Sequence, residues 1–166
     1  MELKTYQRQV IADLNRYLEL LGDTKDYIAS FRLFWQEKGA PTLGSYQDVL
    51  PGVPNLCFKV PTGGGKTFLA CNAVRPVFDA LPFTKTKAVV WLVPSDAILT
   101  QTVKALKNPR HPYRQKIDVD FCGRVEVYTK QELLNGQNFN PPLPLPNSSP
   151  LWCCPTIPSV AGARRA

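Results

Sequence analysis

Apolar residues recur with a helical period at the start of the chain. From Leu3 they return at Tyr6, Val10, Ile11, Leu14, Tyr17, Leu18 and Leu21, the 3.6-residue spacing of an amphipathic helix. Gly22 is placed to end this helix. Aromatic residues within 24–38 predict a second short helix, and the prolines and glycines between 41 and 54 predict a loop.

Later segments alternate between strand and helix patterns. Residues 56–60 form a short apolar run, and residues 88–94 form a longer one, typical of a parallel strand covered on both faces. Helical segments follow, over 67–80 and after Ser95, which is a candidate N-cap. Residues 123–129 alternate as a further strand does. This order predicts an α/β fold with a parallel sheet and helices on its faces.

A glycine cluster lies between the first of these strands and its helix, in Thr62-Gly63-Gly64-Gly65-Lys66-Thr67. Without Cβ atoms, the backbone N–H groups from Gly63 to Thr67 can all turn toward a phosphate at the helix N-terminus. Lys66 then reaches the β- and γ-phosphates of ATP, and Thr67 offers its hydroxyl to Mg²⁺. We therefore predict a P-loop that binds ATP and Mg²⁺ through Thr62 to Thr67, with Lys66 and Thr67 as candidate catalytic residues. A glycine-rich turn with a chance lysine is the alternative.

The general P-loop pattern, G-x-x-x-x-G-K-[ST], has glycine where this chain has Val60. A Pro-Thr-Gly run before Gly-Lys-Thr resembles motif I of superfamily 2 helicases and translocases, where that first glycine is often absent. Upstream, the pair Tyr6-Gln7 resembles the Q motif of the same group, which implies that Gln7 contacts adenine. An amide can both donate to and accept from this base. A packed surface helix is the alternative for that segment.

The strand that ends at Pro94 and the helix that carries Gln101 resemble helicase motif Ia. The resemblance implies that Pro94, Ser95 and Gln101 lie against the backbone of DNA, where contacts position the protein without reading sequence. An ordinary connection between a strand and a helix is the alternative. Residues 108–116 follow as a predicted basic loop; it contains the only histidine, His111, and its side chains either contact phosphates or are solvated.

Taken together, these segments and the strand at 125–129 resemble the N-terminal helicase part of the restriction (Res) subunit of type III restriction enzymes, over residues 2–141. The resemblance implies a partial RecA-like domain at 1–141, ATP-driven translocation along DNA and a methyltransferase subunit as partner. The family's nuclease domain has no counterpart in this sequence. Open alternatives are another DEAD/DEAH-box helicase, a small P-loop kinase or other NTPase, and a nucleotide-binding remnant without turnover.

Composition adds a few limits. The net charge of +7 suits a polyanionic partner such as DNA. Five cysteines without a C-x-x-C pair argue against a disulfide framework and a zinc site. No apolar run approaches the roughly 20 residues of a membrane span, and the N-terminus lacks the plan of a signal peptide. We therefore expect a cytoplasmic protein without membrane contact.

The segment from Pro141 onward has a different composition. It contains seven of the sixteen prolines and no acidic residue, which predicts a disordered, proline-rich tail over 142–166. Moving the frame by one nucleotide across Ser148 to Val160 permits a buried-strand pattern, which favours a frameshifted tail. After Thr129 the one acidic residue is Glu132, with no apolar strand before it, so we expect no Walker B box.

Overall fold

A computed structural model describes residues 1–40, 46–80 and 87–136, and the backbone of 151–156. The chain divides into two compact units, Met1–Pro82 and Phe83–Ala166. The boundary between them lies inside the segment 1–141 that the sequence predicts to be one domain.

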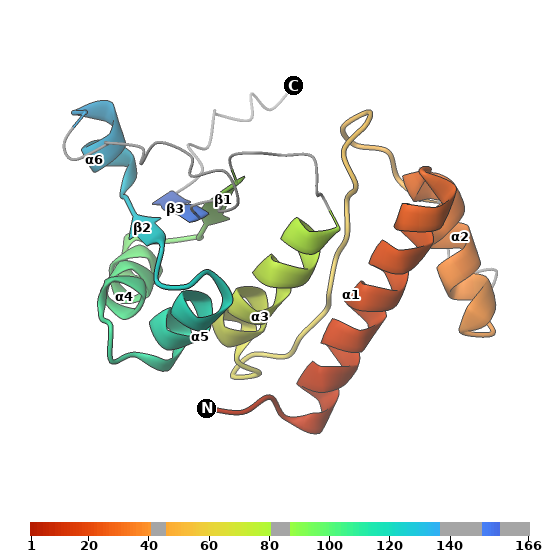
Figure 1. The fold of residues 1–166 in the computed structure, drawn as a ribbon, viewed down its shortest axis with the longest axis horizontal. Helices are drawn as coiled ribbons and strands as arrows, with labels where there is room; N and C mark the ends of the chain where they lie inside the picture. The colour runs from red at the N-terminus through yellow and green to blue at the C-terminus, as the bar shows by residue number, and fades with distance from the viewer. Residues whose placement is uncertain (41–45, 81–86, 137–150, 157–166) are drawn as a thin grey trace, which may run out of the picture. The chain divides into compact units, whose positions relative to one another are not determined.

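The first unit is helical. It contains α1 (Thr5–Thr24), α2 (Tyr27–Glu37) and α3 (Lys66–Asp79) (Figure 1). The amphipathic pattern predicts α1 correctly, but the end predicted at Gly22 is wrong. The helix continues until Lys25, whose left-handed backbone (φ 55°) lets its N–H donate to Leu21 O at 3.0 Å. Gly22 lacks the positive φ of a helix-ending glycine, so the reversal falls at Lys25 instead.

The core of this unit lies along α1, which packs against both α2 and α3. Tyr17, Leu20 and Phe34 form a buried cluster between α1 and α2. The predicted strand at 56–60 is wrong: these residues have no regular secondary structure, because a strand requires a hydrogen-bonded partner strand. The helix predicted at 67–80 is confirmed as α3, displaced by one residue.

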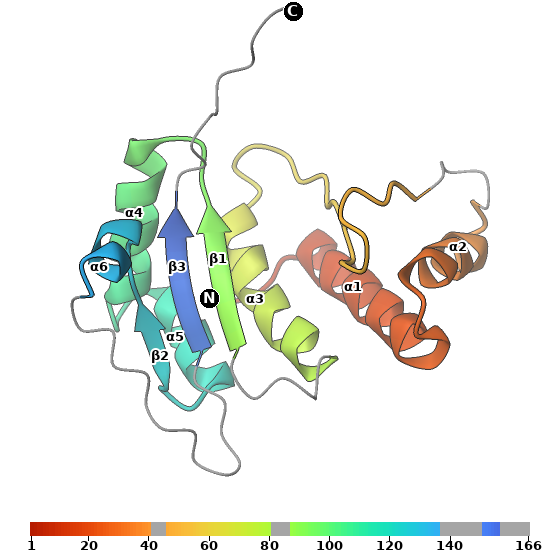
Figure 2. The ribbon, with the colours of Figure 1, turned by 90° about the horizontal axis from the view of Figure 1, so that it is seen from above.

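The second unit contains a three-stranded parallel sheet (Figure 2). Its elements are β1 (Lys87–Leu92), α4 (Asp96–Lys107), α5 (Pro112–Asp120), β2 (Val125–Val127), α6 (Lys130–Leu134) and β3 (Leu151–Thr156). β3 lies between the other two strands, with Cys153 opposite both Val89 and Val127. α4 packs on β2 and β3.

The strand β1 differs from the expected one in its burial. Val89 and Trp91 are half-buried, but Val90 and Leu92 are 64% and 61% exposed. A continuous apolar run indicates burial on both faces only where both faces are covered. Within the described residues of this unit, the face of β1 that carries Val90 and Leu92 is exposed.

Helix α5 replaces part of the predicted basic loop. The His111 side chain accepts a hydrogen bond from Tyr113 N–H at 3.2 Å and so caps the helix, and Pro112 occupies its first position. Proline suits that position because its N–H would lack an intrahelical partner anyway. The loop prediction is therefore wrong for 112–116.

Two other segments differ from prediction. β2 is shorter than the predicted strand at 123–129, because Cys122 and Gly123 both have positive φ and form a turn before it. Residues 151–156 have a paired, extended backbone where the sequence predicts a disordered tail; Leu151 and Trp152 begin an apolar stretch compatible with pairing. The remainder of that tail, 142–150 and 157–166, lies outside the described residues.

Within the described ranges, no helix is long and apolar enough to cross a membrane.

Candidate nucleotide-binding site

The loop before α3 has the backbone that its glycines permit. Gly63 (φ 74°) and Gly65 (φ 69°) both adopt the left-handed conformation that favours glycine. Gly64 N–H donates to Pro61 O at 3.0 Å and closes a turn over 61–64. This N–H is therefore engaged within the loop, and the expectation that every N–H from Gly63 to Thr67 turns toward a phosphate is wrong for Gly64.

The N-terminus of α3 supplies the next N–H groups. Gly65 is the N-cap, and Lys66 and Thr67 are the first two helical residues. The first intrahelical bond runs from Leu69 N–H to Gly65 O at 2.9 Å, so the N–H groups of Lys66 and Thr67 precede it. Helix N-termini combine such N–H groups with the positive end of the helix dipole and favour anions.

Gly64 explains how the loop closes without the first glycine of the general P-loop pattern. A Cβ added to Gly64 would lie 2.7 Å from Val60 Cγ1 and 2.8 Å from Pro61 O. Val60 therefore occupies the space that a side chain at Gly64 would fill. We conclude that glycine at 64 and a bulkier residue at 60 are a complementary pair.

The Lys66 side chain lies back over the loop. Its ammonium donates to Pro61 O at 3.0 Å, and the residue is exposed. A phosphate oxygen carries more charge than a carbonyl and forms a stronger hydrogen bond with an ammonium. The Lys66 ammonium can therefore exchange its hydrogen bond with Pro61 O for one with a phosphate at little cost in free energy. Thr62 is exposed and Thr67 is half-buried in the same loop.

Two side chains from the start of α1 meet on this loop. The Tyr6 hydroxyl donates to Gly64 O at 2.6 Å, and Gln7 Nε2 donates to the same oxygen at 2.8 Å. Gln7 is 2% exposed. The sequence predicts a role for Gln7 but none for Tyr6. The position of Tyr6 directly before Gln7 was the sequence feature that could have indicated its contact with the loop.

The Gln7 amide keeps capacity for a further partner. Its Oε1 accepts from Lys4 N–H at 2.9 Å, and its Nε2 donates to Gly64 O. A glutamine amide has two N–H donors and two acceptor lone pairs, so one of each remains. One donor and one acceptor match the N7 and N6 groups of adenine.

The donor set also fits magnesium that arrives bound to a nucleotide. Mg²⁺ prefers oxygen ligands, keeps several waters and is commonly held by substrate phosphates with few protein groups. The Thr67 hydroxyl in the first turn of α3 is such a group. Among the described residues, no cluster of three or more His, Cys, Asp or Glu side chains forms a separate metal site.

The residues predicted to contact DNA belong to the second unit. Ser95 Oγ accepts from Ile98 N–H at 3.5 Å, which confirms the predicted N-cap of α4. Pro94 and Gln101 are exposed, before and on this helix. The P-loop belongs to the first unit, so the two predicted sites lie in different units.

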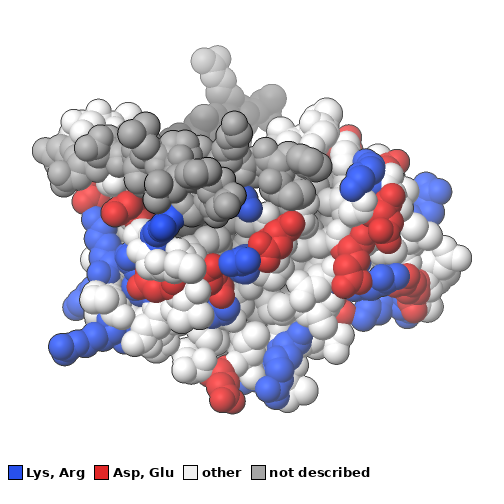
Figure 3. All heavy atoms as spheres, in the orientation of Figure 1, with Lys and Arg blue, Asp and Glu red and all other residues white. Residues whose placement is uncertain are grey.

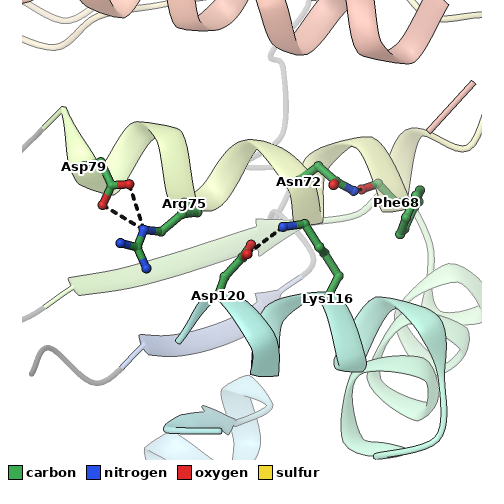
Figure 4. A network of polar contacts seen from close by, with 6 residues as sticks. All are labelled: Phe68, Asn72, Arg75, Asp79, Lys116 and Asp120. Carbon is green, nitrogen blue, oxygen red and sulfur yellow. Dashed lines mark hydrogen bonds and ion pairs between the residues drawn. The ribbon is translucent and has the colours of Figure 1, made fainter. Parts of the chain in front are cut away.

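Two basic side chains that the sequence considered for phosphate contacts have partners within their own unit. Arg114 Nε pairs with Asp118 at 2.8 Å, and its Nη2 donates to Val125 O at 2.9 Å. Lys116 pairs with Asp120 at 2.5 Å (Figure 4). Figure 4 shows the same arrangement on α3, where Arg75 pairs with Asp79. These pairs stabilise the helices that carry them.

Glu132 follows the strand β2 (Val125–Val127), so the expectation that no apolar strand precedes it is wrong, and its carboxylate has a structural role. One carboxylate oxygen accepts from Thr129 N–H at 2.6 Å, and Glu132 N–H donates to the Thr129 hydroxyl, which forms a capping box at α6. The other oxygen pairs with Lys107 at 2.7 Å. The hydrogen bond from Lys107, followed by that from the Thr129 backbone, lowers the pKa of Glu132 to about 2.

Comparison with known proteins gives a family match. The model of the family described as "Type III restriction enzyme, res subunit" matches residues 1–141, which include the P-loop, Gln7 and α4. The search of curated proteins and the search of solved structures each gave no match. Because the family match spans well over half of the 166 residues, the chain belongs to the family of type III restriction enzyme Res subunits, a group of helicase-like P-loop NTPases.

Proposed function

We propose that this chain binds magnesium-ATP through Thr62 to Thr67, as the ATP-binding part of a DNA translocase in a type III restriction system. The observation that carries the proposal is the loop itself. Gly63 and Gly65 have the positive φ angles that a phosphate-binding loop needs. Lys66 lies at the N-terminus of α3, and its ammonium donates to Pro61 O, which a phosphate oxygen can replace. We assign the motor region to residues 1–141, which the family match covers, and β3 (Leu151–Thr156) from the segment that follows completes the sheet of the second unit.

Gln7 contributes selectivity for adenine in this proposal. Its amide retains one donor and one acceptor beside the loop, the pair that adenine requires. Guanine has an acceptor, O6, where adenine has the N6 amino group, so the Gln7 acceptor would face another acceptor. ATP is therefore favoured over GTP.

Replacing Gln7 with alanine should remove this preference. One hydrogen bond contributes about 0.5–1.5 kcal/mol, so the ratio of ATP to GTP affinity should fall by roughly two- to tenfold, toward one. Calorimetric titration with both magnesium nucleotides measures the ratio, in which any general weakening of the loop cancels. Gln9→Ala is the matched control, because Gln9 is exposed on the same helix and donates to Asp13. An unchanged ratio in Gln7→Ala would remove Gln7 from base recognition.

The DNA-binding part of the proposal rests on the start of α4. Figure 3 shows acidic and basic side chains interspersed over one face of the molecule, without a large surface of a single sign. Net charge therefore does not locate the DNA site. Ser95 accepts the capping hydrogen bond and keeps its hydroxyl proton for a phosphate, and Gln101 is exposed. We assign backbone contacts with DNA to Pro94, Ser95 and Gln101.

A negative charge at Gln101 should weaken binding to DNA. Two like charges about 4 Å apart repel by about 1 kcal/mol in water, so Gln101→Glu should raise the Kd for a short labelled duplex roughly fivefold at low salt. Fluorescence anisotropy at two salt concentrations measures this effect, which salt should reduce. Gln115→Glu introduces the same charge at an exposed position of α5 and should change little. Equal effects of both variants would contradict a local DNA contact at Gln101.

The family assignment also suggests a modification methyltransferase as partner and a cytoplasmic location. Both stay predictions that rest on the family alone. Co-purification of a DNA methyltransferase with this chain would test the first.

A further inference from the structure

We propose that Tyr6 is a positioning residue for the P-loop, which deepens the proposed function and rests on it. The Tyr6 hydroxyl donates to Gly64 O at 2.6 Å, the shorter of the two hydrogen bonds to that oxygen. Gly64 is buried, whereas Tyr6, in the first turn of α1, is 39% exposed. The hydroxyl thus reaches from a surface residue to the buried backbone of the loop.

The hydrogen bond from Tyr6 bears on phosphate binding because it helps to set the orientation of the peptide between Gly64 and Gly65. In a trans peptide, the C=O of Gly64 and the N–H of Gly65 point in opposite directions in one plane. Tyr6 and Gln7 together use both lone pairs of Gly64 O and fix that plane. The Gly65 N–H is therefore held on the side away from α1. Gly65 is the N-cap of α3, so its N–H lies next to those of Lys66 and Thr67.

The peptide between Gly64 and Gly65 needs such a constraint because the loop consists of glycines. Gly63 and Gly65 both have positive φ, and glycine reorients more freely than any other residue. A loop of three glycines would lose conformational entropy each time it closed on a phosphate. The hydroxyl of Tyr6 fixes one peptide plane of the loop before a phosphate binds. Tyr6 should therefore increase the affinity for the phosphates of the nucleotide and leave base selectivity unchanged.

The test compares Tyr6→Phe with the wild-type chain, titrated with the magnesium complexes of ATP, GTP and inorganic tripolyphosphate. Loss of one hydrogen bond predicts a roughly two- to tenfold weaker affinity for all three, with an unchanged ratio of ATP to GTP. Tyr17→Phe is the matched control, since Tyr17 lies on the same helix and donates to Tyr27 O at 3.2 Å. It should leave all three affinities unchanged, and thermal unfolding reports whether either variant loses stability.

The outcomes separate this inference from the proposed function. Wild-type protein that binds ATP, together with a Tyr6→Phe variant that binds all three ligands equally well, overturns the role of Tyr6 and leaves the P-loop assignment intact. A loss confined to ATP assigns Tyr6 to the base and also overturns it. Equal losses in the Tyr6 and Tyr17 variants indicate a general loss of stability. Wild-type protein that binds none of the ligands overturns both proposals.

Discussion

Lys66→Ala is expected to abolish measurable binding of magnesium-ATP. Lys66 is exposed at the loop and its ammonium donates to Pro61 O, a bond that it can exchange for one to the β- and γ-phosphates. A hydrogen bond to a charged group contributes about 1.5–3 kcal/mol, and two such bonds would be lost. We therefore expect the affinity to fall roughly 100-fold or more, as measured by isothermal titration calorimetry.

Lys59→Ala is the control for this experiment. Lys59 is an exposed lysine just before the loop, so its removal changes the net charge by the same amount. The affinity of Lys59→Ala for magnesium-ATP should stay within about twofold of wild type, because the charge of an exposed lysine outside the loop is weakened by water and salt. Thermal unfolding should show that both variants fold. Equal affinity of Lys66→Ala and wild type would refute the P-loop assignment.

Local patterns predicted the elements that depend on nearby residues. The spacing of apolar residues predicted α1, and Ser95 predicted the start of α4, because a helix and its cap are built from residues within one or two turns. The three glycines before Lys66 predicted the loop for the same reason. Its φ angles are a property of those residues themselves.

Contacts between distant segments were harder to predict. Tyr6 and Gln7 donate to Gly64 across sequence separations of 58 and 57 positions, respectively, and a local sequence pattern cannot reveal contacts over such separations. Val60 appeared to be a departure from the P-loop pattern until the structure placed it against Gly64. The error at 56–60 has the same origin, since an extended segment becomes a strand only if a distant segment pairs with it.

Side-chain charges were misleading where they pair within one helix. The run from Asn108 to Lys116 is basic in sequence and was predicted to be a loop, but Arg114 and Lys116 face acidic residues one turn later on α5. Such i,i+4 pairs are typical of helices. The capping side chain was His111, a residue type that seldom signals a helix start, so the helix was missed.

The 166-residue chain alone is expected to bind ATP without hydrolysing it at a useful rate. Phosphoryl transfer needs a carboxylate that holds magnesium and orients water, and an arginine that offsets charge on the γ-phosphate, which alone is worth about 10³–10⁵ in rate. After Thr129 the chain has one carboxylate, Glu132. It is held in the capping box of α6 and by Lys107, with a pKa lowered to about 2. The Glu132 carboxylate is therefore engaged in structural contacts, and we do not expect it to act in catalysis.

Phosphate release from the purified chain, with and without DNA, measures this expectation. The rate should equal that of Lys66→Ala, which reports contaminating ATPases, and DNA should not increase it. Turnover that DNA stimulates and that Lys66→Ala abolishes would show that a catalytic carboxylate is present. Glu132→Gln then identifies it: a loss of turnover without a loss of ATP binding would assign catalysis to Glu132, whereas unchanged turnover would place the carboxylate elsewhere in the chain.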